Sequence, residues 1–566
     1  MEKYVCGPLI SLGAMLVACS AAPMSSDVGG KGGDSGNGGG NEAGHSAGEA
    51  GSDGTTAGTS GGSAGIGGQL SGGGSGGNGG TSGAAIDPWI VDTSNWGPCQ
   101  KVNAPAGVTI GSSPLVTKPV VADHCLPVGS TVSRTMDLLA TSTAEHRHRV
   151  KILYYGQSIT RDADSSPKWF EKVTSTLKQK YPHAQIETEM LAVGGFGATE
   201  MLGPSMMDFP AHYPDLVIWH NYGGYTDSEQ LLQYWRKATT AEIAIQNWHP
   251  KGTDKQLSPT NGEERMSYVY LPDIGKRLGA ELVDIRTPWR QRWLAMNTPV
   301  SDLVKPDNTH LAQGGSEWMA EFTLASLKHD DKVIVDPLKL VRSYRVGSDI
   351  KWDGRKLSLQ FDGNRVELLA APSPATREAA ADVTVDGMAP SKFSSAYVHG
   401  RPNGAVDADW PWRTAAPSSV EAKSGLVVEE WTLTITQIAY SEPVTCTYNV
   451  TGSVTGPDGT GQCQSTFTSN SGRVVIPAKA WGHLLTAKNA NYKVTVTPNT
   501  KFKWKVVPLH EDKYPPALLM PNNAGAEHWT TVVSNIPNGR HTLELRAMGT
   551  ETPQISAIRV FRPPLR

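Results

Sequence analysis

The stretch Lys151-Ile152-Leu153-Tyr154-Tyr155-Gly156-Gln157-Ser158-Ile159-Thr160 decides the fold of this chain. Residues 152–155 are apolar or aromatic, a composition typical of a buried β-strand. The run stops at Gly156, and a serine follows just beyond the point where the strand would end. Ser158 is therefore a candidate nucleophile.

Short apolar runs alternate with helical patterns from Val150 to about Leu327. This alternation predicts a parallel sheet covered by helices on both faces, that is, a three-layer α/β/α domain. Ligands of such sheets bind beyond the carboxyl ends of the strands, where Ser158, Gly194 and Asn221 would emerge. After the strand at 150–156, the expected strands are 186–193, 215–219 and 281–285. One expected helix begins near residue 169, and the others span 199–207, 228–243, 263–278 and 315–327.

The pattern changes to β-type alternation after about Asp336. Many short strands with turn signals predict one or more C-terminal β-sandwich domains. Clear examples are residues 356–361, 382–387, 431–435, 536–545 and 555–561.

A chain of 566 residues is too long for a single core. We expect a lead-in region at 87–149 that is irregular or contains β-structure, for example at Thr131-Val132. The α/β domain then covers 150–335 and the β-sandwich region 336–566, with an inserted or second β unit at about 400–520.

The N-terminal 19 residues have an apolar core, Tyr4 to Val17, of the length of a signal peptide and too short for an ordinary membrane-spanning helix. This segment ends in Leu16-Val17-Ala18-Cys19, which resembles the lipobox of bacterial lipoproteins. The resemblance implies cleavage before Cys19 and lipidation of its thiol; an ordinary secretory signal is the alternative. We expect an extracytoplasmic protein, lipid-anchored to a bacterial membrane at the outer membrane or cell surface, with no other membrane contact.

Residues 20–86 are rich in glycine and serine and have almost no large apolar side chains. Such a segment cannot bury enough surface to offset its conformational entropy, so we expect a disordered tether. Two Gly-x-Ser-x-Gly matches within it, at 44–48 and 61–65, have no strand or helix beside them and reflect composition only.

The chain contains six cysteines, of which one lies in the predicted signal and Cys19 would carry lipid. The other four form two local pairs, Cys99 with Cys125 and Cys446 with Cys463. In an exported protein, a disulfide within each pair is the expected state. Zinc binding is the competing interpretation, but no Cys-x-x-Cys motif or nearby histidine set supports it.

The formal net charge is −3, so the chain has no basic field for nucleic acid and no polybasic stretch for anionic lipid. No spacing of histidine, cysteine or carboxylate residues indicates a metal site, and none indicates an organic cofactor. We expect a small ester or an acylated polysaccharide as the partner.

A serine hydroxyl needs a base to accept its proton, and that base usually needs an orienting carboxylate. The segment Val304-Lys305-Pro306-Asp307-Asn308-Thr309-His310-Leu311 offers both, because Asp307 and His310 lie three residues apart just before the last predicted helix of the α/β region. On a loop or a first helical turn, this spacing can bring both side chains to one side.

The chain resembles the SGNH (GDSL-like) hydrolase family over about residues 150–328. Four blocks in the family's order carry the resemblance: Gly156–Thr160, Gly194–Gly197, His220-Asn221 and Asp307–His310. Together these blocks are far more specific than any one of them.

The resemblance implies a Ser-His-Asp triad. Ser158 would be the nucleophile, His310 the general base and then the acid, and Asp307 its orienting partner. The oxyanion hole would consist of the backbone N–H groups of Ser158 and Gly194 and the side-chain amide of Asn221.

Two positions depart from the family pattern. Gln157 stands where the first block usually has an aspartate, and Tyr222 follows Asn221 where an aspartate is usual. Neither change removes a group assigned to bond making, so both bear on substrate specificity more than on catalysis.

We therefore expect a secreted, membrane-tethered serine esterase that hydrolyses acyl esters, chiefly acetyl esters, on extracellular polysaccharide. A lipase or thioesterase of the same family is one alternative. A glycan-binding or adhesion lipoprotein with a non-catalytic hydrolase domain is the other.

Overall fold

A computed structural model describes residues 97–98, 124–125, 129–162, 164–258, 261–371, 378–404, 410–485, 494–515 and 525–565. All described residues lie within Ala85–Arg566. The predicted signal, the lipid site at Cys19, the tether and Cys99 lie outside them, so the expectations about these features stay predictions. Within the described residues, no helix has the length and apolar character needed to cross a membrane.

A five-stranded, all-parallel sheet forms the centre of the α/β region, as predicted. Its order is β4-β3-β5-β6-β7, so the first strand in sequence, β3, lies inside the sheet and its two successors pair on opposite sides of it. The strands are β3 (Arg149–Gly156), β4 (Gln185–Met190), β5 (Leu216–His220), β6 (Glu242–Gln246) and β7 (Glu281–Val283).

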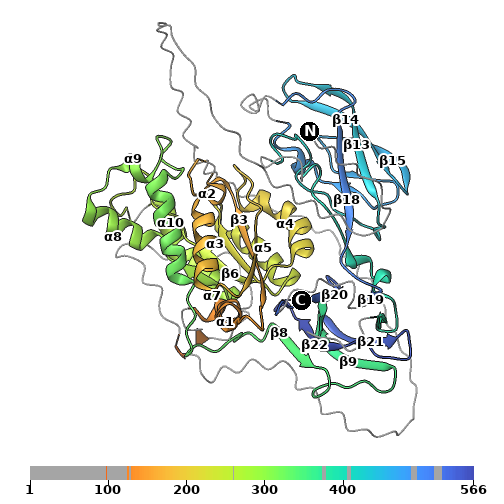
Figure 1. The fold of residues 1–566 in the computed structure, drawn as a ribbon. Helices are drawn as coiled ribbons and strands as arrows, with labels where there is room; N and C mark the ends of the chain where they lie inside the picture. Colours follow the sequence, from red (N-terminus) through yellow and green to blue (C-terminus); the bar gives the residue numbers. More distant parts are fainter. Residues whose placement is uncertain are drawn as a thin grey trace, which may run out of the picture. The chain divides into compact units, whose positions relative to one another are not determined.

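Helices cover both faces of this sheet, which confirms the three-layer prediction. Along β3, Ile152 and Tyr154 join a core with one set of helices, whereas Leu153 and Tyr155 join a core with another. In Figure 1, β3 accordingly lies between α3 and the pair α4 and α5. The first set includes α3 (Trp169–Lys180) and α10 (Gln313–Ser326), and the second α4 (Ala198–His212), α5 (Tyr225–Ala238) and α7 (Leu271–Leu278).

Strand β6 was missed by the sequence patterns, which predict one helix over residues 228–243. The structure ends α5 at Ala238 and begins β6 at Glu242. All five residues of β6 are buried, so its short apolar run lacks the alternation of a half-exposed strand and cannot be told from buried helix by periodicity. Helices α8 (Arg286–Met296) and α9 (Val300–Leu303) were also not predicted.

The β-like run expected at Thr131-Val132 is wrong. These residues lie in a 3₁₀ turn, η1 (Ser130–Val132), that leads into helix α1 (Ser133–Thr141). Carboxylates from the sheet fix this start, because Glu281 accepts the Thr131 hydroxyl at 2.7 Å and Glu242 accepts the Arg134 backbone N–H at 2.9 Å. Such capping outweighs β-propensity. The lead-in region does contain one short antiparallel pair, β1 (Gly97–Pro98) with β2 (His124–Cys125).

Two four-stranded antiparallel sheets form the predicted C-terminal β-sandwich and share one core. Their orders are β20-β10-β22-β8 and β19-β11-β21-β9. The strands are β8 (Val341–Arg345), β9 (Lys356–Gly363), β10 (Arg365–Ala370), β11 (Ala381–Val385), β19 (Lys513–Tyr514), β20 (Trp529–Val533), β21 (Gly539–Ala547) and β22 (Ile555–Phe561).

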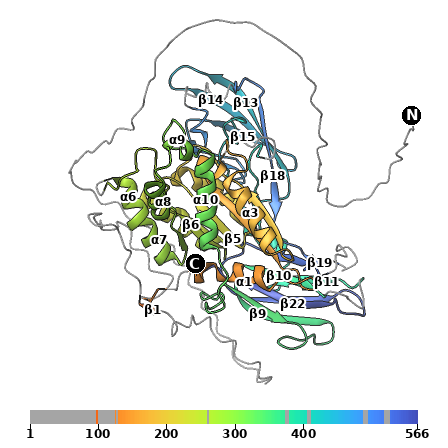
Figure 2. The ribbon, with the colours of Figure 1, turned by 60° about the vertical axis from the view of Figure 1, so that its left-hand side comes forward.

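Residues 397–508, here called the insert, lie between β11 and β19 in the chain and form a separate five-stranded sheet of order β12-β18-β13-β14-β15. Figure 2 shows β13, β14 and β15 grouped apart from β9, β11 and β22. A disulfide joins Cys446 to Cys463, as expected, with their Cα atoms 5.4 Å apart. The strands are β12 (Tyr397–His399), β13 (Glu430–Ala439), β14 (Thr445–Gly452), β15 (Gly456–Gln462) and β18 (Lys501–Pro508).

A buried charge cluster joins the β-sandwich to the α/β sheet. Glu367 of β10 is 2% exposed and lies 2.6 Å from Arg365 and 3.4 Å from Arg149, the first residue of β3. Burial alone would raise the pKa of Glu367, but the guanidinium groups of Arg365, Arg149 and Arg559 lower it to about 2. The ionised carboxylate therefore stabilises this junction.

The Glu367→Gln variant tests this junction. A folded pKa of about 2 against an ordinary value of 4.5 means that the stabilisation is complete above pH 4.5 and is lost as the pH falls toward 2. The shift corresponds to about 3 kcal/mol of unfolding free energy at neutral pH. We expect Glu367→Gln to lose that amount at pH 7 and to show a flatter decline between pH 4.5 and 2 in urea unfolding. The exposed Glu187→Gln is the matched control, and equal acid slopes for Glu367→Gln and the unmodified chain would contradict the assignment.

Candidate active site

Ser158 is the first residue of the short helix α2 (Ser158–Arg161), which follows β3 directly. The first N–H groups of a helix have no intrahelical acceptor, so the Ser158 N–H is available to a ligand. Gly156 permits the tight junction: its φ is +149°, and an added Cβ would lie 1.9 Å from the carbonyl oxygen of His220 at the end of β5. The nucleophile predicted from sequence therefore stands at the carboxyl edge of the sheet.

Asp307 and His310 lie on the loop between α9 and α10. A bridge between Val304 and Leu311 closes this loop at its base, and the Lys305 N–H donates to the His310 carbonyl at 2.8 Å. Asn308 takes a positive φ of 62° at the tip. This tight loop brings the two side chains to one side, as the three-residue spacing predicts.

The three predicted triad residues form one hydrogen-bonded chain. His310 Nδ1 lies 2.7 Å from Asp307 Oδ2, and His310 Nε2 lies 2.9 Å from Ser158 Oγ. Because a carboxylate can only accept, the imidazole proton belongs on Nδ1, which leaves the Nε2 lone pair facing the serine hydroxyl. This is the arrangement that general-base activation of a serine requires.

Asp307 is held in its ionised form. Partial burial would raise its pKa, but hydrogen bonds from the backbone N–H groups of His310 and Thr309, and from the imidazole, bring the pKa below its ordinary value. Both N–H groups donate to Oδ1 at 2.9 Å, so Oδ2 stays directed to the imidazole. The side chain is 50% exposed, so these bonds, more than burial, set its orientation.

Gly194 lies beside the nucleophile, as the resemblance implies. The segment after β4 continues along β3, with the Val193 N–H donating to the Gly156 carbonyl at 2.9 Å. A Cβ added to Gly194 would lie 4.0 Å from the Cβ of Ser158. The carbonyl of Gly194 accepts a hydrogen bond from the indole N–H of Trp412, a residue of the insert, at 2.5 Å.

Asn221 follows β5 and is 1% exposed. Its carbonyl accepts the indole N–H of Trp248 at 2.8 Å, which fixes the backbone. Within the described part of the chain, neither polar atom of its buried side-chain amide has a hydrogen-bond partner. An unsatisfied buried amide is costly, and a negatively charged ligand oxygen would satisfy its N–H group.

The two departures from the family pattern both place buried groups near the site. Gln157 stands at the N-cap position of α2 without a side-chain capping bond and is 6% exposed, and its side-chain nitrogen has no partner among the described residues. Burial raises the pKa of Tyr222, so its phenol stays neutral. Neither residue takes the place of a triad member.

A further histidine, not found from sequence, supports the catalytic loop. His249 is fully buried, and its Nε2 lies 2.9 Å from the carbonyl oxygen of Thr309. Because a carbonyl only accepts, Nε2 must carry the proton, and burial lowers the pKa of His249 to about 4, which keeps the ring neutral. His249 follows β6, so recognition of that strand would have placed it at the same edge as Ser158.

Arg286 fixes the backbone that carries His249. Its Nη1 donates to the carbonyl oxygens of Trp248 and His249 at 3.1 Å each. Its charge is balanced by Glu264 and Asp254, each at 2.9 Å. The loop after β6 is therefore rigid where it contacts the loop of His310.

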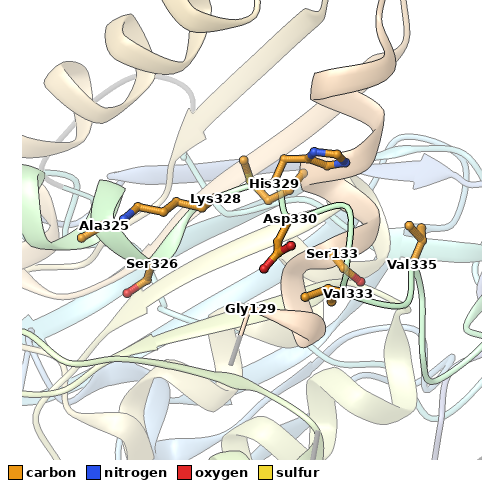
Figure 3. Close-up of a pocket in the computed structure, with 10 residues that line it drawn as sticks. Gly129, Ser133, Ala325, Ser326, Lys328, His329, Asp330, Val333 and Val335 are labelled. Atoms are coloured by element: carbon orange, nitrogen blue, oxygen red, sulfur yellow. The ribbon is translucent and has the colours of Figure 1, made fainter. Parts of the chain in front are cut away.

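Figure 3 shows a different cavity, of about 210 Å³, near the C-terminal end of α10. His329 and Asp330 line it, and no triad residue does. Since α10 has 14 residues and begins soon after His310, this cavity lies roughly 20 Å from the triad along the helix.

Over the described ranges, no group of three or more histidine, cysteine or carboxylate residues could hold a metal ion.

The role of His249 can be measured with a matched pair of variants. His249→Leu removes the donor to the Thr309 carbonyl, and the loss of one buried hydrogen bond predicts about a tenfold fall in kcat for hydrolysis of a small ester. His249→Gln keeps a donor at this position and should recover most of the rate. His399 makes the same type of bond, at 2.9 Å to the Arg473 carbonyl, away from the site. Equal kcat losses in His399→Leu and His249→Leu would show that the effect is not specific to the loop.

No protein-family model and no curated protein matches this chain. Among solved structures, it is similar to a two-domain esterase (CEX) active on acetylated mannans, co-crystallised with mannopentaose: 12% identity, TM-score 0.30, covering 77% of this chain and 96% of that one. It is also similar to the acetyl xylan esterase AlAXEase, with 16% identity and a TM-score of 0.28 over 31% of this chain and 99% of that one. Axe2, an acetylxylan esterase from Geobacillus stearothermophilus, has 14% identity and a TM-score of 0.28 over 33% and 97%. Likenesses of this size carry no argument about activity.

Proposed function

We propose that this protein is a serine esterase in which Ser158, His310 and Asp307 are the catalytic triad. The observation that carries the proposal is the hydrogen-bonded chain from Ser158 Oγ through the imidazole to Asp307, with bonds of 2.9 and 2.7 Å. A serine that only capped a helix would need neither a histidine nitrogen at its hydroxyl nor a carboxylate behind that histidine.

In the first half of the reaction, Ser158 Oγ attacks the ester carbonyl carbon while His310 Nε2 takes the hydroxyl proton. The carbonyl oxygen becomes an oxyanion, which the N–H groups of Ser158 and Gly194 and the amide of Asn221 stabilise. Each such donor contributes about 3 kcal/mol to the transition state. The intermediate then expels the alcohol, which receives the proton from His310, and leaves an acyl group on Ser158.

In the second half, water replaces the alcohol. His310 removes a proton from the water as it attacks the acyl carbon, and the oxyanion forms again at the same donors. Collapse of this intermediate releases the carboxylic acid and returns the proton to Ser158 Oγ. Asp307 stabilises the imidazolium in both halves and keeps its own charge.

Our proposed substrates are short acyl esters, chiefly acetyl esters, on extracellular polysaccharide. The predicted export signal and lipid site at Cys19 support a position outside the cytoplasm, where such polymers are found. The β-sandwich and the insert supply surfaces beyond the hydrolase domain that a long substrate could contact. No metal or cofactor takes part in the proposed reaction.

The triad assignment is tested by hydrolysis of p-nitrophenyl acetate. Ser158→Ala and His310→Ala should each lower kcat/KM at least about a thousandfold, and the double variant should lose no more than either alone because the residues act as a unit. Ser175→Ala, an exposed helical serine, is the matched control. If Ser158→Ala retained the hydrolysis rate of the parent chain, Ser158 would not be the nucleophile, and glycan binding by that chain would favour the binding-protein alternative. A series of longer acyl chains separates the acetyl-esterase proposal from a lipase.

A further inference from the structure

A cavity of about 390 Å³ lies beside the turn that contains Gly194. This volume falls within the range of about 300–1,000 Å³ typical of small-molecule sites. One wall belongs to the α/β domain and the other to the insert. Its lining includes Phe196, Thr199 and Glu200 on the first wall and Trp412, Ser419 and Lys479 on the second.

The cavity neighbours the proposed oxyanion hole in the chain and in space. Gly195 lines it, and the preceding residue, Gly194, lies beside Ser158. Trp412 connects the two places, because its indole N–H donates to the Gly194 carbonyl while its ring lies 6.0 Å from that of Phe196. The cavity therefore lies one residue from Gly194 and shares Trp412 with it, close enough to receive a unit next to the one whose ester is at Ser158.

Contacts between the insert and α4 make the cavity a preformed one. Arg401 of the insert donates to both carboxylate oxygens of Asp208, at 2.8 and 2.6 Å, and also to the Leu191 carbonyl at 3.1 Å. Nearer the start of α4, a Cβ added to Gly203 would lie 2.7 Å from the Cβ of Ser419. The two walls are therefore closely packed and joined by a bidentate ion pair, which fixes the space between them.

The side chains that line the cavity indicate which class of ligand it can bind. Glu200 and Lys479 give one charge of each sign, so the cavity does not favour a strongly charged chain. The hydroxyl groups of Thr199 and Ser419 offer donors and acceptors, and Trp412 and Phe196 offer aromatic surface. A long acyl chain would need a continuous apolar lining, whereas a neutral sugar has hydroxyl groups and an apolar face that match this mixture.

We propose that this cavity is a carbohydrate subsite, which receives the neutral sugar unit next to the acylated unit of a polysaccharide. The subsite makes the insert part of the substrate-binding site, although residues 397–508 lie outside the α/β domain in sequence. This inference rests on the proposed esterase function, because the acylated unit is defined by the position of Ser158.

The test is a binding measurement on the full chain with the nucleophile removed. Mannopentaose, xylopentaose and cellopentaose are titrated by calorimetry into Ser158→Ala, and at least one should bind. In that background, Lys479→Ala removes a polar lining group and Thr199→Trp fills the cavity from the first turn of α4. Each should weaken binding of that pentaose at least tenfold, whereas Lys178→Ala, an exposed lysine on α3, should leave it unchanged.

Thermal unfolding of each variant shows that a loss of binding is not a loss of fold. Unchanged affinity in both Lys479→Ala and Thr199→Trp, or no binding of any pentaose to Ser158→Ala, would overturn the subsite. The result is separate from the test of the triad, since binding is measured on a chain without its nucleophile. An esterase that binds none of these pentaoses would keep the proposed chemistry and lose only the subsite.

Discussion

The close contact of β3 with β5 at Gly156 is the constraint on which the rest of the site depends. Only a residue without a side chain fits there, because a Cβ would lie 1.9 Å from the His220 carbonyl. β3 pairs with β4 on one edge and with β5 on the other, so the strand order reverses direction between β3 and β5. In sheets of this kind, ligands bind in the crevice at the carboxyl ends of the two strands where the order reverses. Ser158 and Asn221 reach the same place because their strands are in contact at this point.

The position of His310 depends on contacts that hold its loop in place. The loop that carries it is closed at its base by the bridge between Val304 and Leu311, and His249 bonds the Thr309 carbonyl from behind. Asp162, at the end of α2, accepts the Ser316 hydroxyl of α10 at 2.5 Å and so connects the helix of the nucleophile to the helix that follows His310. Separate contacts therefore hold the helix of Ser158 and the loop of His310.

Sequence patterns predicted those parts of the site that depend on residues close together in the chain. The triad residues stand next to strand or helix ends whose signals are clear in sequence, and the order of the family's blocks grouped them before any distance was known. Strand β6 could not be found in this way, because its five buried residues show no alternation, and His249 was missed with it. Trp412 was missed for a different reason: its bond to Gly194 joins residues 218 positions apart, and no periodicity reports such a contact.

The central claim is that His310 and Asp307 activate Ser158 as a nucleophile, and covalent labelling tests it most directly. The intact chain is treated with a fluorophosphonate, which reacts with activated serines, and the labelled peptide is identified by mass spectrometry. We predict a single adduct on Ser158, whose formation slows strongly in His310→Ala. An adduct on another serine, or a chain that stays unlabelled under conditions that label a known serine esterase, would contradict the account.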